Sequence, residues 1–171
     1  MRLRFWRTVI LIAVAVLAAF WVWALFFASK EAINKIGDRR WAARAESICE
    51  AAQARRQALL DERVVDAEDP AMLAERAGIV DQATAIVETM LDDVVAVAPN
   101  DDKGMAIVPQ WEADYRTYLE DRRTFTNRLR EGANEPFTET AVDGIPISEK
   151  LEQFAGDNEM PSCAPPRDLA N

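Results

Sequence analysis

The sequence TVILIAVAVLAAFWVWALFFAS, residues 8–29, decides how the chain is organised. Its 22 residues include no ionisable side chain, and Arg7 and Lys30 enclose it. At a rise of 1.5 Å per residue a helix of this length reaches roughly 33 Å, enough to cross a hydrocarbon core of about 30 Å. The stretch therefore predicts one transmembrane helix near the N-terminus.

The end of this stretch favours a retained signal anchor over a cleaved signal peptide. A signal peptide has a shorter apolar core and an A-x-A-like cleavage site, whereas bulky Phe27 stands two residues before Ser29. No cysteine lies nearby, which argues against a lipoprotein. Because tryptophan is typical of membrane–water interfaces, Trp6, Trp21 and Trp23 are predicted to mark the two interfaces.

The direction of insertion does not follow from the flanking charges, because basic residues lie on both sides of the helix. Three arginines precede it, and Lys30, Lys35, Arg39, Arg40 and Arg44 follow. The short N-terminal tail carries no acidic residue, and the cysteines suit an oxidising compartment. We expect residues 1–30 to form a cytoplasmic tail and anchor in the cytoplasmic (inner) membrane, with the remaining domain outside.

The chain after Lys30 has the size and charge of one acidic domain. About 140 residues are enough for one core. They include 16 basic and 29 acidic residues, a net charge of −13. Such a domain repels phosphate backbones, so we expect no nucleic-acid partner. The preference for arginine over lysine, with much Ala, Val and Asp, is typical of a GC-rich bacterial genome.

The apolar spacing predicts two long helices in the first half of this domain. Gly37 and Asp38 are the expected start of the first, which should run to about Val65. No proline lies in residues 29–37, so a membrane helix that runs straight on is the alternative. Asp69 and Pro70 should start the second helix. This helix should reach about residue 98 and, as the most hydrophobic, lie at the centre.

The second half predicts one further long helix and a short one. Pro109 is expected to open the long helix after a loop at 99–108, and Gly132 to end it. Ser148 is the expected cap of the short helix, which should end near Ala155. The fold class is therefore all-α: a transmembrane helix, then an antiparallel bundle of three long helices plus a short fourth. The bundle should occupy residues 31–158, followed by a proline-rich tail at 159–171.

Aromatic residues follow one face of the third long helix. This stripe is expected in the core, and the charged side chains, Arg122 among them, on the opposite face. Trp41 either lies at the lipid headgroups or packs on this helix, and packing is the favoured interpretation. The residues of the stripe are Trp111, Tyr115, Tyr118 and Phe125.

The two cysteines lie near the two ends of the domain. In an extracytoplasmic domain Cys49 and Cys163 are expected to form one disulfide that attaches the tail to the bundle. The alternatives are a buried free thiol at Cys49 and a reactive thiol at Cys163. Two thiols without histidine make half a zinc site, and their spacing is not that of a redox CxxC pair.

No catalytic motif stands out. The chain has no histidine, the commonest general base and metal ligand. Acidic clusters could in principle hold a cation or share a proton, but we expect them to be solvated. They are Asp61, Glu62, Asp66, Glu68 and Asp69, then Asp92 and Asp93, then Asp101 and Asp102. The sequence thus predicts no enzyme, no metal and no cofactor, with a carboxylate-dependent hydrolase as the least favoured alternative.

The layout resembles small bacterial single-pass membrane proteins of the cell envelope that carry an extracytoplasmic helical domain. The resemblance rests on the basic tail at 1–7, the anchor, the segment Ile48-Cys49 and the terminal Pro161-Ser162-Cys163. It implies the plan of the chain and no activity at any position.

These observations lead to two expectations of function. The first is a membrane-anchored interaction module that binds the bilayer and a protein partner, as an accessory subunit of a membrane or envelope complex. The second is a ligand-binding or sensory domain. Because only seven residues precede the apolar stretch, signalling would have to pass through a membrane partner.

Overall fold

The computed structural model describes residues 2–26, 32–59 and 69–169 and is all-α, as predicted. The chain divides into two compact units, Met1–Ala32 and Ile33–Asn171. The elements are α1 (Arg2–Phe26), α2 (Arg39–Gln57), α3 (Pro70–Val95), α4 (Asp102–Arg130), β1 (Ala141–Val142), β2 (Ile145–Pro146), α5 (Ile147–Asp157) and the 3₁₀ helix η1 (Pro161–Cys163).

The first unit consists of α1. Residues Val9–Phe26 are long and apolar enough to cross a membrane, and none of these 18 residues is buried. The alternative of one continuous helix into the bundle is wrong, because residues 32–38 are not helical. The backbone N–H groups of residues 34 and 36–38 instead donate to side chains of the bundle, as described below.

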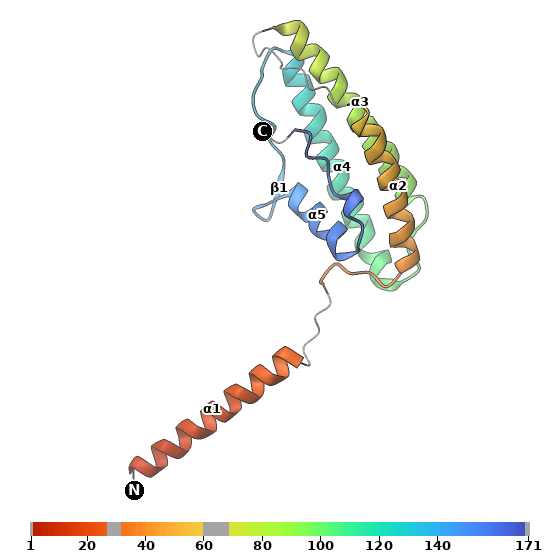
Figure 1. Ribbon diagram of the computed structural model, residues 1–171. Coiled ribbons are helices and arrows are strands. Elements are labelled where there is room, and N and C mark those ends of the chain that lie inside the picture. Colours follow the sequence, from red (N-terminus) through yellow and green to blue (C-terminus); the bar gives the residue numbers. More distant parts are fainter. Residues whose placement is uncertain (1, 27–31, 60–68, 170–171) are drawn as a thin grey trace. The chain divides into compact units, whose positions relative to one another are not determined.

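The second unit is a bundle in which α2, α3 and α4 run alternately in opposite directions (Figure 1). Helix α3 packs against both α2 and α4, in agreement with its predicted central place. Helix α5 packs on α4, and η1 lies against α2 and α5. The proline-rich tail is therefore packed on the bundle, with Met160, Cys163 and Leu169 buried.

The predicted starts of α2 and α3 are confirmed. Asp38 accepts hydrogen bonds from the backbone N–H groups of Arg40 and Trp41. Asp69 accepts one from Ala71, and Pro70 occupies the first helical position. Helix α2 ends at Gln57, earlier than expected. The sequence around Val65 lies outside the described residues.

The predicted start of the third long helix is wrong. Helix α4 begins at Asp102 with Asp101 as its cap, and Pro109 lies inside it. A proline within a helix removes one backbone hydrogen bond. The cap and the burial of Gly104 and Val108 in the preceding turns keep this segment helical despite that loss.

The predicted cap of the short helix is also wrong. Helix α5 starts at Ile147, directly after β2. Its N-cap residue is Pro146, which makes no side-chain capping hydrogen bond. The Ser148 backbone N–H and hydroxyl each donate to the Glu139 carboxylate, at 2.8 Å. The two-residue strands before it form a hairpin whose turn residues, Asp143 and Gly144, have φ of 56° and 80°. Such turns favour Asp-Gly.

The core follows the predicted aromatic stripe of α4. Trp111, Tyr115, Tyr118 and Phe125 are all buried. Trp41 is buried as well, and its ring meets that of Trp111 edge-on at 6.4 Å, so its predicted packing on this helix is confirmed. Phe125 belongs to a smaller apolar cluster, and Phe137 packs against both this cluster and the main core. The cluster consists of Leu73, Ala77, Val80, Phe125, Leu129 and Leu169.

Candidate functional site

The C-terminal segment, residues 161–169, is attached to the bundle by a disulfide. Cys49 of α2 and Cys163 of η1 are bonded, with Cα atoms 5.0 Å apart, and both are fully buried. The predicted pair is thus confirmed, and both free-thiol alternatives are wrong. The hydroxyls of Tyr115 and Tyr118 donate to the carbonyls of Cys163 at 3.1 Å and Pro166 at 2.8 Å.

A buried arginine of α4 holds the end of this segment. Arg122 donates from its two terminal nitrogens to the two carboxylate oxygens of Asp168, at 2.7 and 2.8 Å. Its Nε donates to the Thr84 hydroxyl at 2.9 Å. The expectation that Arg122 lies on the solvent face is wrong, because its side chain is 0% exposed. Arg122 follows Tyr118 by four residues and precedes Phe125 by three, which places it on the buried aromatic face of α4, where the C-terminal segment supplies its partner.

The pair keeps both groups charged in a partly dry environment. Burial alone would raise the pKa of Asp168, but the hydrogen bonds and charge of Arg122 outweigh it and hold this pKa below its ordinary value. Burial has the opposite effect on a cation and alone would lower the pKa of Arg122, but the hydrogen bonds and charge of Asp168 outweigh it and raise this pKa. Two opposite charges that stabilise each other do not supply a proton donor or acceptor near neutral pH. The pair therefore serves to position the segment.

A groove of about 440 Å³ lies between the end of α2 and this segment. We call it the C-terminal groove. It is mixed in charge, with Arg56, Arg167, Glu152 and Asp168 among its lining residues. Arg167 donates to Glu152 at 2.5 Å. The buried Nε of Arg56 has no hydrogen-bond partner among the described residues. The other lining residues are Gln53, Gln57, Pro161, Ser162, Ala164, Pro165 and Pro166.

The acidic clusters do not converge on a cation site in the described part of the chain. No group there combines three or more metal-binding side chains. Asp92 is paired with Arg116 at 3.0 Å, and Asp69 and Asp101 are helix caps. Four of the acidic residues lie outside the described residues, namely Asp61, Glu62, Asp66 and Glu68. The described carboxylates thus have mainly structural partners.

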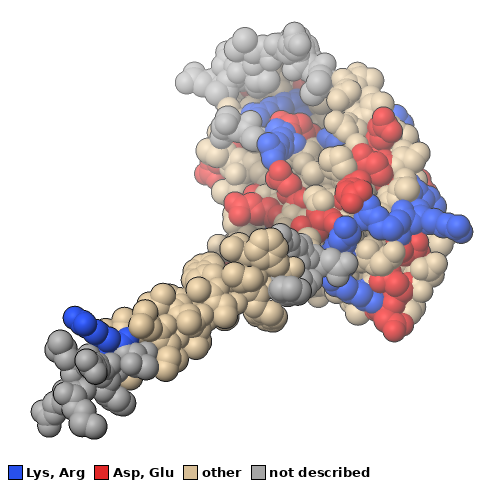
Figure 2. Space-filling model, turned by 60° about the horizontal axis from the view of Figure 1, so that its bottom comes forward, with Lys and Arg blue, Asp and Glu red and all other residues tan. Residues whose placement is uncertain are grey.

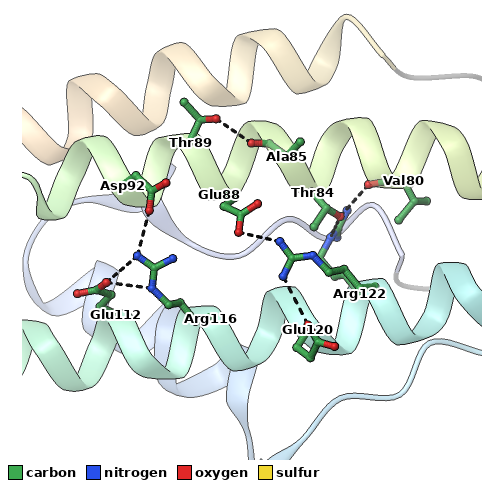
Figure 3. Close-up of polar contacts among 11 residues, drawn as sticks. Val80, Thr84, Ala85, Glu88, Thr89, Asp92, Glu112, Arg116, Glu120 and Arg122 are labelled. Carbon is green, nitrogen blue, oxygen red and sulfur yellow. Dashed lines mark hydrogen bonds and ion pairs between the residues drawn. The ribbon is translucent and has the colours of Figure 1, made fainter.

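Ion pairs also connect the outer faces of α3 and α4. Arg116 lies between Asp92 of α3 and Glu112 of its own helix, with distances of 3.0 and 2.7 Å (Figure 3). Arg123 pairs with Glu88 at 2.7 Å. These side chains are partly solvent-exposed, so water screens each pair and each contributes little stability. They mark a solvated helix face.

Two aspartates connect the starts of α2 and α4 at the end of the bundle where the chain enters it. Asp38 caps α2 and also accepts from the N–H of Asn100 at 3.0 Å. Asp101 caps α4 and accepts from the N–H groups of Gly37 at 3.0 Å and Asp38 at 3.1 Å. Hydrogen bonds from the N–H groups of Trp41, Asn100 and Arg40 lower the pKa of Asp38. Burial would raise the pKa of Asp101, but hydrogen bonds from the N–H groups of Gly37, Gly104 and Asp38 outweigh it, so this pKa is lowered as well.

The entering chain is also bonded to the end of α5. Asn158 is buried; its Oδ1 accepts from the N–H of Ile36 at 2.8 Å, and its amide donates to the carbonyl of Asn34 at 2.9 Å. Asp157 accepts from the Asn34 backbone and side chain, at 3.3 and 3.1 Å. Ile36 itself is buried. Residues 34–38 are therefore part of the bundle, and they fix the position at which the chain from α1 enters it.

The predicted membrane-interface residues all lie on α1. Trp6 is near its start, Trp21 and Trp23 are near its end, and all three are exposed. Their place at a lipid interface stays a prediction.

Comparison with models of known protein families, with curated proteins and with solved structures gave no match.

Proposed function

We propose that the protein is a membrane-anchored interaction module that acts as an accessory subunit of a membrane or envelope complex. The observation that carries this proposal is an apolar helix, exposed along its whole hydrophobic length, joined by six residues to a separately packed, disulfide-bonded bundle. An apolar helix of this kind is stable in lipid, and a disulfide persists in an oxidising compartment. The proposal therefore places the bundle outside the cytoplasmic membrane.

The C-terminal groove is the surface that we propose for the protein partner. It presents basic, acidic and amide side chains along a hollow between a helix and a proline-rich segment. The disulfide and the Arg122–Asp168 pair hold both of its sides, so binding requires little reorganisation. A preorganised polar groove suits an extended or helical segment of another envelope protein.

Crosslinking in intact cells, followed by detergent solubilisation and affinity purification of the full chain, tests this proposal. A partner should be recovered in several detergents and should crosslink near the groove. Gln57→Arg places a charge in the groove and should reduce recovery of the partner, whereas Gln82→Arg on the exposed face of α3 should not. Recovery of the protein alone under all conditions, or equal recovery with both variants, would contradict the proposal.

A ligand-binding or sensory domain is the second candidate, because the groove has a volume within the range of small-molecule sites, about 300–1,000 Å³. Such a domain would act through a membrane partner. Thermal unfolding of the full chain in detergent, with and without pools of small carboxylates, phosphates and amino acids, would test it. A shift that Gln57→Arg abolishes would favour this function over the first.

A further inference from the structure

Most of the exposed large apolar side chains in the described part of the bundle gather at one end. Four such residues are exposed, with fractions of 77% for Ile33, 55% for Val97, 51% for Met105 and 47% for Ile145. Ile33 precedes α2, Val97 follows α3 and Met105 is near the start of α4, so three of the four belong to the end where the chain enters. Ile145 belongs to the hairpin. We call this end, residues 33–44, 96–105 and 157–159, the entry end.

The entry end also differs in charge from the rest of the bundle. It holds five basic residues, Lys35, Arg39, Arg40, Arg44 and Lys103, and five acidic ones, Asp38, Asp101, Asp102, Asp157 and Glu159. The net charge of −13 found after Lys30 therefore comes from the other residues. Figure 2 turns this end toward the viewer and shows basic and acidic side chains interspersed on it.

Several of the acidic groups at this end already have partners within the protein. Asp38 and Asp101 accept backbone hydrogen bonds from two helix starts. Glu159 lies 3.9 Å from Lys35 and 2.5 Å from Arg39. Arg40 and Lys103 are exposed beside these groups. An anionic surface would thus meet less repulsion here than on the acidic remainder of the bundle.

The length of the connection limits which part of the bundle can reach a membrane that holds α1. Seven residue steps separate Phe26 from Ile33, and an extended chain covers at most about 25 Å over that distance. Helix α4, with 29 residues, is about 43 Å long. The bonds of Asn34 and Ile36 to α5 hold the start of the bundle at the entry end. Ile33, and with it the entry end, therefore stays within reach of the end of α1 in any arrangement of the two units, whereas the opposite end of the bundle need not.

We propose that the entry end lies in the headgroup layer of the membrane that holds α1, with the side chains of Ile33, Val97 and Met105 in contact with phospholipid. This inference rests on the proposed anchoring by α1. Exposed apolar groups favour an environment less polar than water, and the balanced charge removes the electrostatic obstacle. The bundle is then oriented on the lipid rather than only connected to it.

Spin labels on single introduced cysteines test this proposal, because both native cysteines are held in the buried disulfide. The full chain is placed in nanodiscs containing phosphatidylglycerol. Depth is measured from the relative access of oxygen and a water-soluble nickel complex to labels at Val97→Cys, Met105→Cys, Ile145→Cys and Leu17→Cys. Labels at 97 and 105 should show a higher oxygen-to-nickel ratio than the matched apolar control at 145. The label at 17 should show the highest ratio.

The outcomes separate the two proposals. If the label at 17 is deep in lipid but those at 97 and 105 behave like that at 145, the docking of the entry end is wrong and the anchoring holds. If the label at 17 has full access to the nickel complex, the anchoring itself is wrong, and this proposal is lost with it. A second variant, Val97→Asp combined with Met105→Asp, should raise hydrogen exchange at 96–105 in nanodiscs. No change in exchange would also contradict the docking.

Discussion

Arg122 and Asp168 differ in exposure, and this difference predicts unequal costs for their single substitutions. The Arg122 side chain is 0% exposed and that of Asp168 is 21% exposed. Asp168→Asn leaves a guanidinium in the core without its charge partner, and breaking a buried pair in this way costs about 3–5 kcal/mol. Arg122→Met leaves a carboxylate that water can reach, so we expect the loss of hydrogen bonds alone, about 1–2 kcal/mol.

The double variant Arg122→Met/Asp168→Asn separates pairing from general disruption. It leaves no uncompensated charge, so its cost should fall below the sum of the single costs by about 1–3 kcal/mol. Urea unfolding of the full chain in detergent micelles, followed by tryptophan fluorescence, measures all four proteins, because Trp41 and Trp111 are buried in the bundle. Additive costs, or an Arg122→Met cost equal to that of Asp168→Asn, would refute the reasoning.

The same cycle has a defined pH dependence. Because the pKa of Asp168 is lower in the folded protein than its ordinary 3.8, its contribution is complete above pH 3.8 and is lost as the pH falls through the folded value. The difference in unfolding free energy between the wild-type protein and Asp168→Asn should therefore be constant from pH 7 to about pH 5 and shrink below pH 3.8. A difference that shrinks near neutral pH would contradict this assignment.

Three further predictions concern the bundle. Gly104→Ala places a Cβ 2.6 and 2.8 Å from neighbouring side-chain atoms and should destabilise the fold, by about 1–3 kcal/mol in urea unfolding. The matched variant Gly78→Ala has open space in the middle of α3 and should stabilise it by about 0.5–1 kcal/mol. Replacing Cys49 and Cys163 by alanine opens a loop with a sequence separation of 114 and should cost about 5 kcal/mol on the chain-entropy estimate. Burial raises the pKa of Tyr115 above its ordinary 10.0, so above pH 10 this tyrosine ionises in the unfolded chain but not in the folded protein. The free energy of unfolding should therefore fall as the pH rises above 10, and tyrosine absorbance during unfolding should show the ionisation.

Each of these three predictions has a result that would contradict it. Equal effects of the two glycine variants would mean that the contacts of Gly104 do not limit its side chain. A double cysteine variant as stable as the oxidised protein would mean that the C-terminal segment needs no covalent attachment. Stability that stays constant from pH 9 to pH 11 would mean that Tyr115 ionises in the folded state as it does in water.

Local signals were sufficient for two of the four helix starts predicted in the bundle. Asp38 and Asp69 accept hydrogen bonds from backbone N–H groups two or three residues later, and Pro70 occupies the first helical position. These helix starts therefore depend only on residues close in sequence. Pro109 misled the prediction because its local signal is the same at a helix start and inside a helix. Which of the two occurs depends on Asp101, whose carboxylate also bonds to the N–H groups of Gly37 and Asp38, more than sixty residues earlier.

The candidate site was predictable only in part. The disulfide was predicted because the chain contains only two cysteines and its bundle was expected in an oxidising compartment. Helical spacing places Arg122 on the aromatic face, four residues after Tyr118, but its charge argued against burial, and its partner Asp168 is 46 residues away. The C-terminal groove left no signal in the sequence, since its sides come from α2, α5 and the final segment. The Asp143-Gly144 dipeptide is a hairpin signal in the sequence, but the strands that it joins are only two residues long, so no alternation of apolar residues accompanies it.

The sequence by itself determined the apolar stretch at 8–29 and the all-α class of the chain, and it predicted the disulfide between Cys49 and Cys163. The first two depend on composition and short-range periodicity and the third on the expected oxidising compartment, so none requires knowledge of distant neighbours. Only the tertiary structure decided that the proline-rich end packs on α4, that Arg122 is buried beneath it and that residues 34 and 36 bond to the end of α5. These features join residues far apart in the chain, and the free energy of such contacts depends on which surfaces the fold brings together.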